Sequence, residues 1–409
     1  MRAQRSCDLS AMRLARCPVS LTFSLLMVLT SLLTAAFAEE ACPAHDLPAP
    51  TGKYAVGTTV LPVEKLQSTR TSRRVQLWYP AISKSAGQPA AYVPDPDIVR
   101  VLRAEQFLNL PDCIFDAWRS MKLAARMDAP IAQLGRLPLV MIAPGAGMSR
   151  ISYSYYAQQL ASDGYIVATV DFSEGGFLVR DGKRVQEAPD AADEAGFGKQ
   201  AQHMAAHMSD LGNELLTNPA DLKLPLVRGI ATHIDPTRIA AIGHSLGGAA
   251  ALDLCMADQR VRGCVDLDGI AGTPVAEQGI TTSTLMLRSQ PDYSDADLLR
   301  LHRDPEQWKA KGEAISAETA KLLAHPGPDA WIVSIHGTGH MSYSDAPITM
   351  PGTLTQFGGT YLDARRVLSI TTEIIEGYLL HVFANRAFSV AQFPEATVQT
   401  SRNQRPPAK

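Results

Sequence analysis

The stretch Gly243-His244-Ser245-Leu246-Gly247-Gly248 decides the fold of this chain. An apolar run, residues 239–242, precedes it, and an alanine-rich segment of helical composition, residues 246–257, overlaps its end. A serine flanked by glycines at a turn from a buried strand into a helix is typical of a nucleophile elbow, in which the tight turn lifts the hydroxyl above the sheet. The motif therefore predicts Ser245 as a nucleophile and places the N–H of Leu246 where it can stabilise an oxyanion.

Further buried strands are predicted on both sides of this motif, because continuous apolar runs are typical of parallel strands that helices cover on both faces. The runs are residues 137–143, 165–171, 238–243, 263–267, 284–288 and 331–336. Helical patterns occupy residues 153–162, 201–216, 246–257 and 364–383. Strands that alternate with helices predict the α/β class, and with the elbow they predict the α/β-hydrolase fold, a mostly parallel central sheet with flanking helices.

Residues 39–409 are expected to form one α/β-hydrolase domain with insertions. Two strand-like segments, residues 54–63 and 74–79, open it. We expect a helical insertion at about residues 86–135, a polar loop at 172–198 and a loop insertion at about 290–328. These three segments are expected to shape the substrate pocket.

Residues 1–38 have the organisation of a signal peptide. Four arginines precede an apolar run, residues 19–33, and Ala36-Phe37-Ala38 supplies a signal peptidase site. The apolar run is shorter than the ~20 residues that a membrane-spanning helix needs, which argues against an uncleaved anchor. We therefore expect cleavage after Ala38 and a periplasmic or secreted protein.

The charge balance argues against one class of partner. The whole chain carries a net charge of −3, and removal of four Arg and one Asp with residues 1–38 makes it −6. No basic surplus is left to neutralise phosphates, so no nucleic-acid partner is expected.

Four cysteines follow the expected cleavage site: Cys42, Cys113, Cys255 and Cys264. An even number in an oxidising compartment permits two disulfides. Cys255 and Cys264 bracket a short helix-to-strand turn, so we favour that pair, which leaves Cys42 with Cys113; buried free thiols are the alternative. The sequence has no CxxC, HExxH or Cys/His cluster, so neither a metal nor another cofactor is expected.

The segment Pro144-Gly145-Ala146-Gly147, which we call the oxyanion loop, follows the first of the parallel strands. In this fold the corresponding loop donates the second oxyanion N–H, and we assign that donor to Ala146, paired with Leu246. Gly145 and Gly147 allow the backbone to approach a substrate closely. We place both glycines, together with Tyr153, in the substrate pocket; for Tyr153, packing is the alternative.

The base is sought among the histidines after Ser245, because the chain order in this fold is Ser, acid, His. His336 ends the last predicted parallel strand, and His340 follows it in Gly337-Thr338-Gly339-His340. Ligands bind at the carboxyl edge of open α/β sheets, and a glycine-containing loop at that edge can present an imidazole. We therefore favour His340 over His336.

The acid has three candidates. Asp266 and Asp268 flank the end of the strand after the elbow helix, and Asp292 follows the next strand, where many hydrolases of this fold carry their acid. Asp266 is also a candidate for a buried structural carboxylate. Spacing alone does not choose between Asp268 and Asp292.

These residues resemble those of the plasma-type platelet-activating-factor acetylhydrolases and their bacterial relatives. The matching stretches run in order along nearly the whole chain after residue 38: residues 54–57, 75–80, 144–147, 243–248, 266–269 and 339–345. The resemblance implies Asp268 as the acid and Ala146 and Leu246 as oxyanion donors. Two departures, Pro144 in place of a frequent His and Leu246 in place of the usual Phe, reshape the acyl pocket without removing a backbone donor.

The sequence therefore predicts a serine esterase or lipase that cleaves carboxylic esters through an acyl-enzyme, with Ser245, His340 and Asp268 as its triad. The resemblance implies a phospholipid substrate with a short or oxidised acyl chain, and with it transient contact with a lipid surface. A cutinase-like polyester hydrolase and an acyltransferase are the alternatives among enzymes, and a non-catalytic binding protein is the alternative outside them. A serine-directed probe distinguishes an enzyme from a binding protein, and added alcohol acceptors distinguish a transferase from a hydrolase. A polymer film, compared with soluble esters, distinguishes cutinase-like from lipase-like action.

Overall fold

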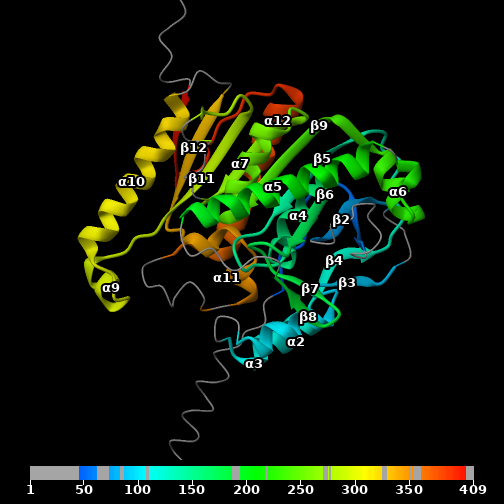
Figure 1. Ribbon diagram of the computed structural model, residues 1–409, viewed down its shortest axis with the longest axis horizontal. Coiled ribbons are helices and arrows are strands. Elements are labelled where there is room, and N and C mark those ends of the chain that lie inside the picture. Colours follow the sequence, from blue (N-terminus) through cyan, green and yellow to red (C-terminus); the bar gives the residue numbers. More distant parts are fainter. Residues whose placement is uncertain are drawn as a thin grey trace, which may run out of the picture. The chain divides into compact units, whose positions relative to one another are not determined.

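The computed structural model describes residues 46–61, 73–82, 87–106, 110–186, 194–217, 219–269, 275, 278–324, 329–350, 352 and 361–401 (Figure 1). All of them belong to one compact unit, residues 44–409. The expected signal peptide and Cys42 lie outside the described residues, so the cleavage after Ala38 stays a prediction.

A mixed sheet forms the centre of the described part of the chain. In spatial order its 11 strands are β13 (Ala396–Thr400), β12 (Ala330–His336), β11 (Ser283–Gln290), β10 (Val261–Leu267), β9 (Ile234–His244), β5 (Leu137–Ala143), β6 (Ile166–Phe172), β2 (Arg73–Ala81), β1 (Ala55–Leu61), β4 (Lys122–Met127) and β3 (Pro89–Ala91). All neighbours from β12 to β6 pair in parallel. The edge pairs β12–β13 and β3–β4 are antiparallel, as are the pairs of β2 with β6 and β1. The predicted α/β fold, with its mostly parallel sheet, is confirmed.

Helices cover both faces of the parallel strands, which explains why every residue of β5 and β6 is buried. On one face α5 (Glu194–Leu216) lies against α7 (Leu246–Ala257), and both contribute to the main apolar core (Figure 1). On the other face α4 (Ser154–Asp163) contacts α12 (Ala364–Ala384).

Helix α12 is long and apolar enough to cross a membrane by length and composition, but it packs against the sheet. Its Tyr378 hydroxyl accepts the N–H of Cys264 and donates to the carbonyl of Ser283. Half of its most apolar window is buried in the interior, as in the core helix of a globular domain.

The insertions differ in part from the expectation. Residues 86–135 hold the expected helices, α2 (Pro96–Ala104) and α3 (Asp112–Ser120), but β3 and β4 in the same segment extend the sheet. The expectation of a loop at about residues 290–328 is wrong, because this insertion contains α9 (Asp295–Arg300) and α10 (Pro305–Ala324). A capping box at Ser294 and Asp297 starts α9, and α10 is rich in the helix formers Ala, Lys and Glu.

The remaining short elements lie in the connections. They are the hairpin β7 (Leu178–Arg180) and β8 (Lys183–Val185), α6 (Pro225–Thr232), α11 (Ala346–Thr349), η2 (Arg150–Tyr153), η3 (Pro219–Asp221) and η4 (His340–Tyr343). The hairpin lies within the segment expected as the polar loop 172–198.

The favoured disulfide is present. Cys255 at the end of α7 is bonded to Cys264 in β10, with a Cα–Cα distance of 6.3 Å. Cys113 is disulfide-bonded as well, to a partner outside the described residues, so its expected pairing with Cys42 stays a prediction.

Candidate active site

Ser245 occupies a sharp turn between β9 and α7. Its backbone has φ 56° and ψ −119°, a conformation that is rare for a residue with a side chain. Flanking glycines are required by space, because a Cβ at Gly243 would lie 1.8 Å from the carbonyl oxygen of Gly247, and one at Gly247 would lie 2.3 Å from that of Ala143. The predicted elbow is therefore present with its expected glycine roles.

The strand ends that carry the predicted site lie level with one another. Gly243 of β9 pairs with Ala143 of β5 on one side and with Asp266 of β10 on the other. Gln290 of β11 pairs with His336 of β12. The oxyanion loop, the elbow and the loops after β10 and β12 consequently emerge at one edge of the sheet.

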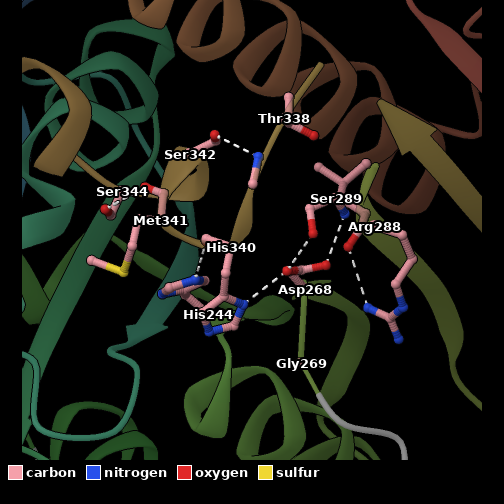
Figure 2. Close-up of polar contacts among 12 residues, drawn as sticks. His244, Asp268, Gly269, Arg288, Ser289, Thr338, His340, Met341, Ser342 and Ser344 are labelled. Carbon is pink, nitrogen blue, oxygen red and sulfur yellow. Dashed lines mark hydrogen bonds and ion pairs between the residues drawn. The ribbon is translucent and has the colours of Figure 1, made fainter. Parts of the chain in front are cut away.

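Asp268 and His340 are in direct contact at this edge (Figure 2). Oδ2 of Asp268 lies 2.8 Å from Nδ1 of His340, and Ser289 donates to Oδ1 through its N–H and to Oδ2 through its hydroxyl, both at 2.8 Å. Burial acts to raise the pKa of Asp268, but the hydrogen bond and charge of His340 and the N–H of Ser289 outweigh it and lower the pKa to about 2. The carboxylate is thus ionised and fixes a proton on Nδ1, which leaves Nε2 as the basic nitrogen.

The other acid candidates do not take this position. Asp266 is fully buried, pairs with Arg288 at 2.8 Å and accepts the N–H of Gly269 at 2.7 Å. Burial raises its pKa, against the opposing charge of Arg288. Asp292 is exposed in the loop after β11, and no polar contact joins it to His340 in the described part of the chain. The structure thus distinguishes Asp268, which contacts His340, from Asp292, which does not, although spacing alone did not choose between them.

His340, rather than His336, contacts the candidate acid Asp268. His336 remains in β12, where its N–H donates to the carbonyl of Glu395. His340 begins η4, and its side chain is 49% exposed. We call residues 337–340, which connect β12 to this imidazole, the base loop.

Two of the three N–H groups in the oxyanion loop have hydrogen-bond acceptors among the described residues. Gly145 donates to the hydroxyl of Tyr153 at 3.0 Å, and Gly147 donates to the carbonyl of Gly175 at 2.9 Å. Among the described residues, neither Ala146 nor Leu246 has an acceptor for its N–H. Ala146 is exposed, and Leu246 is the first residue of α7, where N–H groups point out of the helix. Both N–H groups are therefore free, within the described residues, for the oxyanion role that the sequence predicts for them.

Tyr153 does not line a pocket, contrary to the expectation. Its side chain is fully buried beneath the oxyanion loop, where its hydroxyl lies 2.8 Å from Nδ1 of His244. Gly145 is buried as well, and a Cβ there would lie 3.1 Å from Nδ1 of His244, whereas Gly147 is partly exposed. Of the three expected pocket residues, only Gly147 is open to a ligand.

His244 is a functional candidate that sequence reasoning missed. Its ring lies 4.7 Å from the ring of His340, and its Nε2 lies 2.8 Å from the carbonyl oxygen of His340 (Figure 2). Burial, and then the nearby His340, lower the pKa of His244 to about 3, so it is neutral at physiological pH. Only its place beside Ser245 in the motif could have drawn attention to it.

Comparison with known proteins shows which family the chain belongs to. The family model described as "Platelet-activating factor acetylhydrolase, isoform II" matches residues 40–178. The model described as "Alpha/beta hydrolase family" matches residues 139–387, more than half of the chain. The chain belongs to the alpha/beta hydrolase family.

This alpha/beta hydrolase is similar to curated proteins named platelet-activating factor acetylhydrolase, which confirms the resemblance predicted from its motifs. It is 26% identical to the dog protein (Canis lupus familiaris) over 54% of each chain, and 22% identical to the chicken protein (Gallus gallus) over 74% of each chain. The matches to the dog and guinea pig (Cavia porcellus) proteins thus span about half the length of those relatives.

A solved structure supports the fold of this alpha/beta hydrolase. The ferulic acid esterase from Streptomyces cinnamoneus superposes with a TM-score of 0.64 over 87% of this chain and 99% of its own, at 22% sequence identity. At that identity the likeness concerns the fold.

An aromatic cluster of this alpha/beta hydrolase borders the base loop. The hydroxyl of Tyr293 lies 2.7 Å from that of Tyr361, and the ring of Tyr293 packs edge-on against Trp308 of α10 at 5.7 Å. Arg303 covers the face of Trp308 at 4.5 Å. A Cβ at Gly339 would lie 2.8 Å from the ring of Tyr361, so the cluster touches the base loop. All four side chains are partly exposed.

Within the described ranges, no group of three or more His, Cys, Asp or Glu side chains is arranged to hold a metal ion.

Proposed function

We propose that this protein is a serine carboxylic-ester hydrolase. The observation that carries the proposal is the 2.8 Å contact between Asp268 and His340 at the sheet edge where Ser245 forms the elbow. An acid, a base and a serine in the chain order of this fold, beside two N–H groups that have no acceptor in the described part of the chain, make up the parts needed for acyl transfer.

The proposed reaction has two steps. Nε2 of His340 takes the proton of the Ser245 hydroxyl as its oxygen attacks the ester carbonyl, and the N–H groups of Ala146 and Leu246 stabilise the oxyanion. His340 then gives the proton to the departing alcohol, which leaves an acyl-enzyme. Water attacks the acyl-enzyme as His340 takes its proton, and His340 returns that proton to the Ser245 oxygen as the carboxylic acid departs. Asp268 remains ionised throughout and stabilises the imidazolium.

The substrate class that we favour is a phospholipid with a short or oxidised acyl chain. The support is the similarity to the platelet-activating factor acetylhydrolases. Such a substrate is drawn from a lipid surface, so we propose transient contact with one. Leu299 of α9, whose side chain is 62% exposed, and Ile315 of α10 provide apolar surface on the insertion that follows β11.

A second substrate class, aromatic esters and polyesters, is favoured by the aromatic cluster beside the base loop. An alcohol that leaves with the proton from His340 departs toward this side of the site. Partly exposed rings of Tyr293, Trp308 and Tyr361 offer edge-on and stacking contacts for an aromatic leaving group.

We also propose that the protein is exported, with cleavage after Ala38, to the periplasm or the cell exterior. The disulfide between Cys255 and Cys264 supports this, because structural disulfides persist in oxidising compartments. Mass spectrometry of the mature N-terminus tests the cleavage site.

The experiment that tests the activity compares wild type with Ser245→Ala on nitrophenyl esters from acetate to dodecanoate, a short-chain phosphatidylcholine and an aromatic polyester film. Loss of turnover in the variant assigns the chemistry to Ser245. The wild-type profile across the panel separates the two substrate classes, and added alcohol acceptors detect acyl transfer. Wild type that is inert on every ester contradicts the proposal.

A further inference from the structure

A chain of buried polar contacts connects the oxyanion loop to the base loop beneath Ser245. The N–H of Gly145 lies 3.0 Å from the hydroxyl of Tyr153, which lies 2.8 Å from Nδ1 of His244, and Nε2 of His244 lies 2.8 Å from the carbonyl oxygen of His340. Tyr153 and His244 are both fully buried. We call these four residues the relay.

The direction of every hydrogen bond in the relay follows from its two ends. A carbonyl oxygen only accepts, so Nε2 of His244 carries a proton that it donates to His340. The ring is neutral, and Nδ1 must therefore accept the proton of the Tyr153 hydroxyl. The hydroxyl oxygen in turn accepts the N–H of Gly145. One tautomer satisfies all three contacts, and a protonated His244 would face the Tyr153 hydroxyl with a donor.

The relay reaches the backbone of the residue that carries the proposed base. The base loop begins with Gly337, at φ 71°, and the His340 side chain is 49% exposed. Asp268 orients the ring from one side, and His244 fixes the backbone of the same residue from the other. The ring of His244 also lies against that of His340, with 4.7 Å between centroids.

We propose that His244, oriented by Tyr153, is a positioning residue that sets where the His340 imidazole lies relative to Ser245 and couples that position to the oxyanion loop through Gly145. The inference rests on the proposed function, because it assigns His340 the role of base. It accounts for a buried histidine beside the nucleophile and for a tyrosine whose hydroxyl accepts from the oxyanion loop.

The test measures steady-state kinetics on nitrophenyl acetate for Tyr153→Phe and for the matched control Tyr155→Phe. Both variants lose one hydroxyl from a buried tyrosine, but that of Tyr155 faces Thr372 of α12. Loss of the relay hydroxyl leaves the Gly145 N–H without an acceptor and the His244 ring without a donor. We expect kcat of Tyr153→Phe to fall ~10- to 100-fold with KM nearly unchanged, and Tyr155→Phe to retain wild-type kcat. Equal kcat values for the two variants overturn the proposal, because packing alone would affect them alike.

A second pair of variants tests His244 itself. His244→Gln keeps an N–H donor for the His340 carbonyl, whereas His244→Leu removes it at similar size. We expect the kcat of His244→Gln to be at least ~10-fold higher than that of His244→Leu. Equal loss of kcat in the two variants contradicts a positioning role.

Labelling of Ser245 by a fluorophosphonate distinguishes failure of the esterase proposal from failure of the relay proposal. Wild type that is not labelled overturns the esterase proposal and the relay with it. Wild type that is labelled no faster than Tyr153→Phe overturns the relay alone.

Discussion

Oδ2 of Asp268 lies 2.8 Å from Nδ1 of His340, although the two residues are 72 positions apart. Asp268 has a left-handed backbone, φ 55°, directly after β10, and Ser289 at the end of β11 holds its carboxylate from the other side. The contact therefore depends on three neighbouring strands of the sheet.

Asp268→Asn is expected to lower kcat by ~10³- to 10⁴-fold, because an amide can donate to Nδ1 and favour the wrong tautomer of His340. The matched control is Asp292→Asn, which changes the exposed aspartate of the next loop and should retain activity. Steady-state kinetics on a nitrophenyl ester check both. The reverse result, an inactive Asp292→Asn and an active Asp268→Asn, would assign the acid to the other loop.

Asp266→Ala is expected to destabilise the fold rather than to act selectively on the chemistry. Asp266 pairs with Arg288, and Nε and Nη2 of that guanidinium have no other partner among the described residues. Removal of one partner of a buried ion pair costs about 3–5 kcal/mol of unfolding free energy. Urea unfolding measures this, and a loss below about 1 kcal/mol would show that the pair does not stabilise the fold.

Glu376→Gln is expected to remove part of the pH dependence of stability. Burial, and then the hydrogen bond and charge of Asp163, raise the pKa of Glu376 from 4.5 to about 8. Between these values the folded protein holds a proton that the unfolded chain has released, so the free energy of unfolding falls as pH rises from about 4.5 to about 8.

The glutamine variant should therefore gain stability over wild type as pH rises, by about 1–2 kcal/mol at pH ~9 after allowance for solvent screening. Asp253 and Asp345, whose pKa values burial raises to about 7 and about 8, titrate in the same window and cancel in this comparison. Urea unfolding at pH 5, 7 and 9 measures the difference. A constant difference across that range would mean that Glu376 does not titrate there.

The double variant Cys255→Ser with Cys264→Ser is expected to lose about 2–3 kcal/mol of unfolding free energy, the loop-closure entropy for a separation of 9 residues. A reducing agent should lower the stability of wild type by more than that of the double variant, which keeps the disulfide of Cys113. Insensitivity of wild type to reduction would contradict a stabilising role for this bond.

The sequence allowed the central fold to be predicted because its signals are local. The run at 137–143 coincides with β5, and the elbow glycines stand where close backbone contacts require them. The edge strands β3 and β13 escaped prediction, since β3 has 3 residues and three of the five residues of β13 are exposed. The polar chain after Asp292 hid α9 and α10 because it lacks a clear apolar period.

The candidate site was predictable in its motifs and not in its contacts. Ser245 and the oxyanion donors follow from adjacent residues, but the choice of Asp268 needs the left-handed turn after β10 and Ser289, 21 residues away. The relay joins Tyr153 to His244 across 91 residues. No spacing rule encodes that contact, so Tyr153 was mistaken for a pocket residue.

The central claim is that Ser245 is the nucleophile of an esterase. The most direct measurement is the hydrolysis of nitrophenyl acetate by wild type and Ser245→Ala, with mass spectrometry of the fluorophosphonate-treated proteins. We expect at least a ~10³-fold loss of kcat/KM in the variant and a phosphonate adduct on Ser245 in wild type only. Equal turnover by the two proteins, or an adduct at another residue, would contradict it.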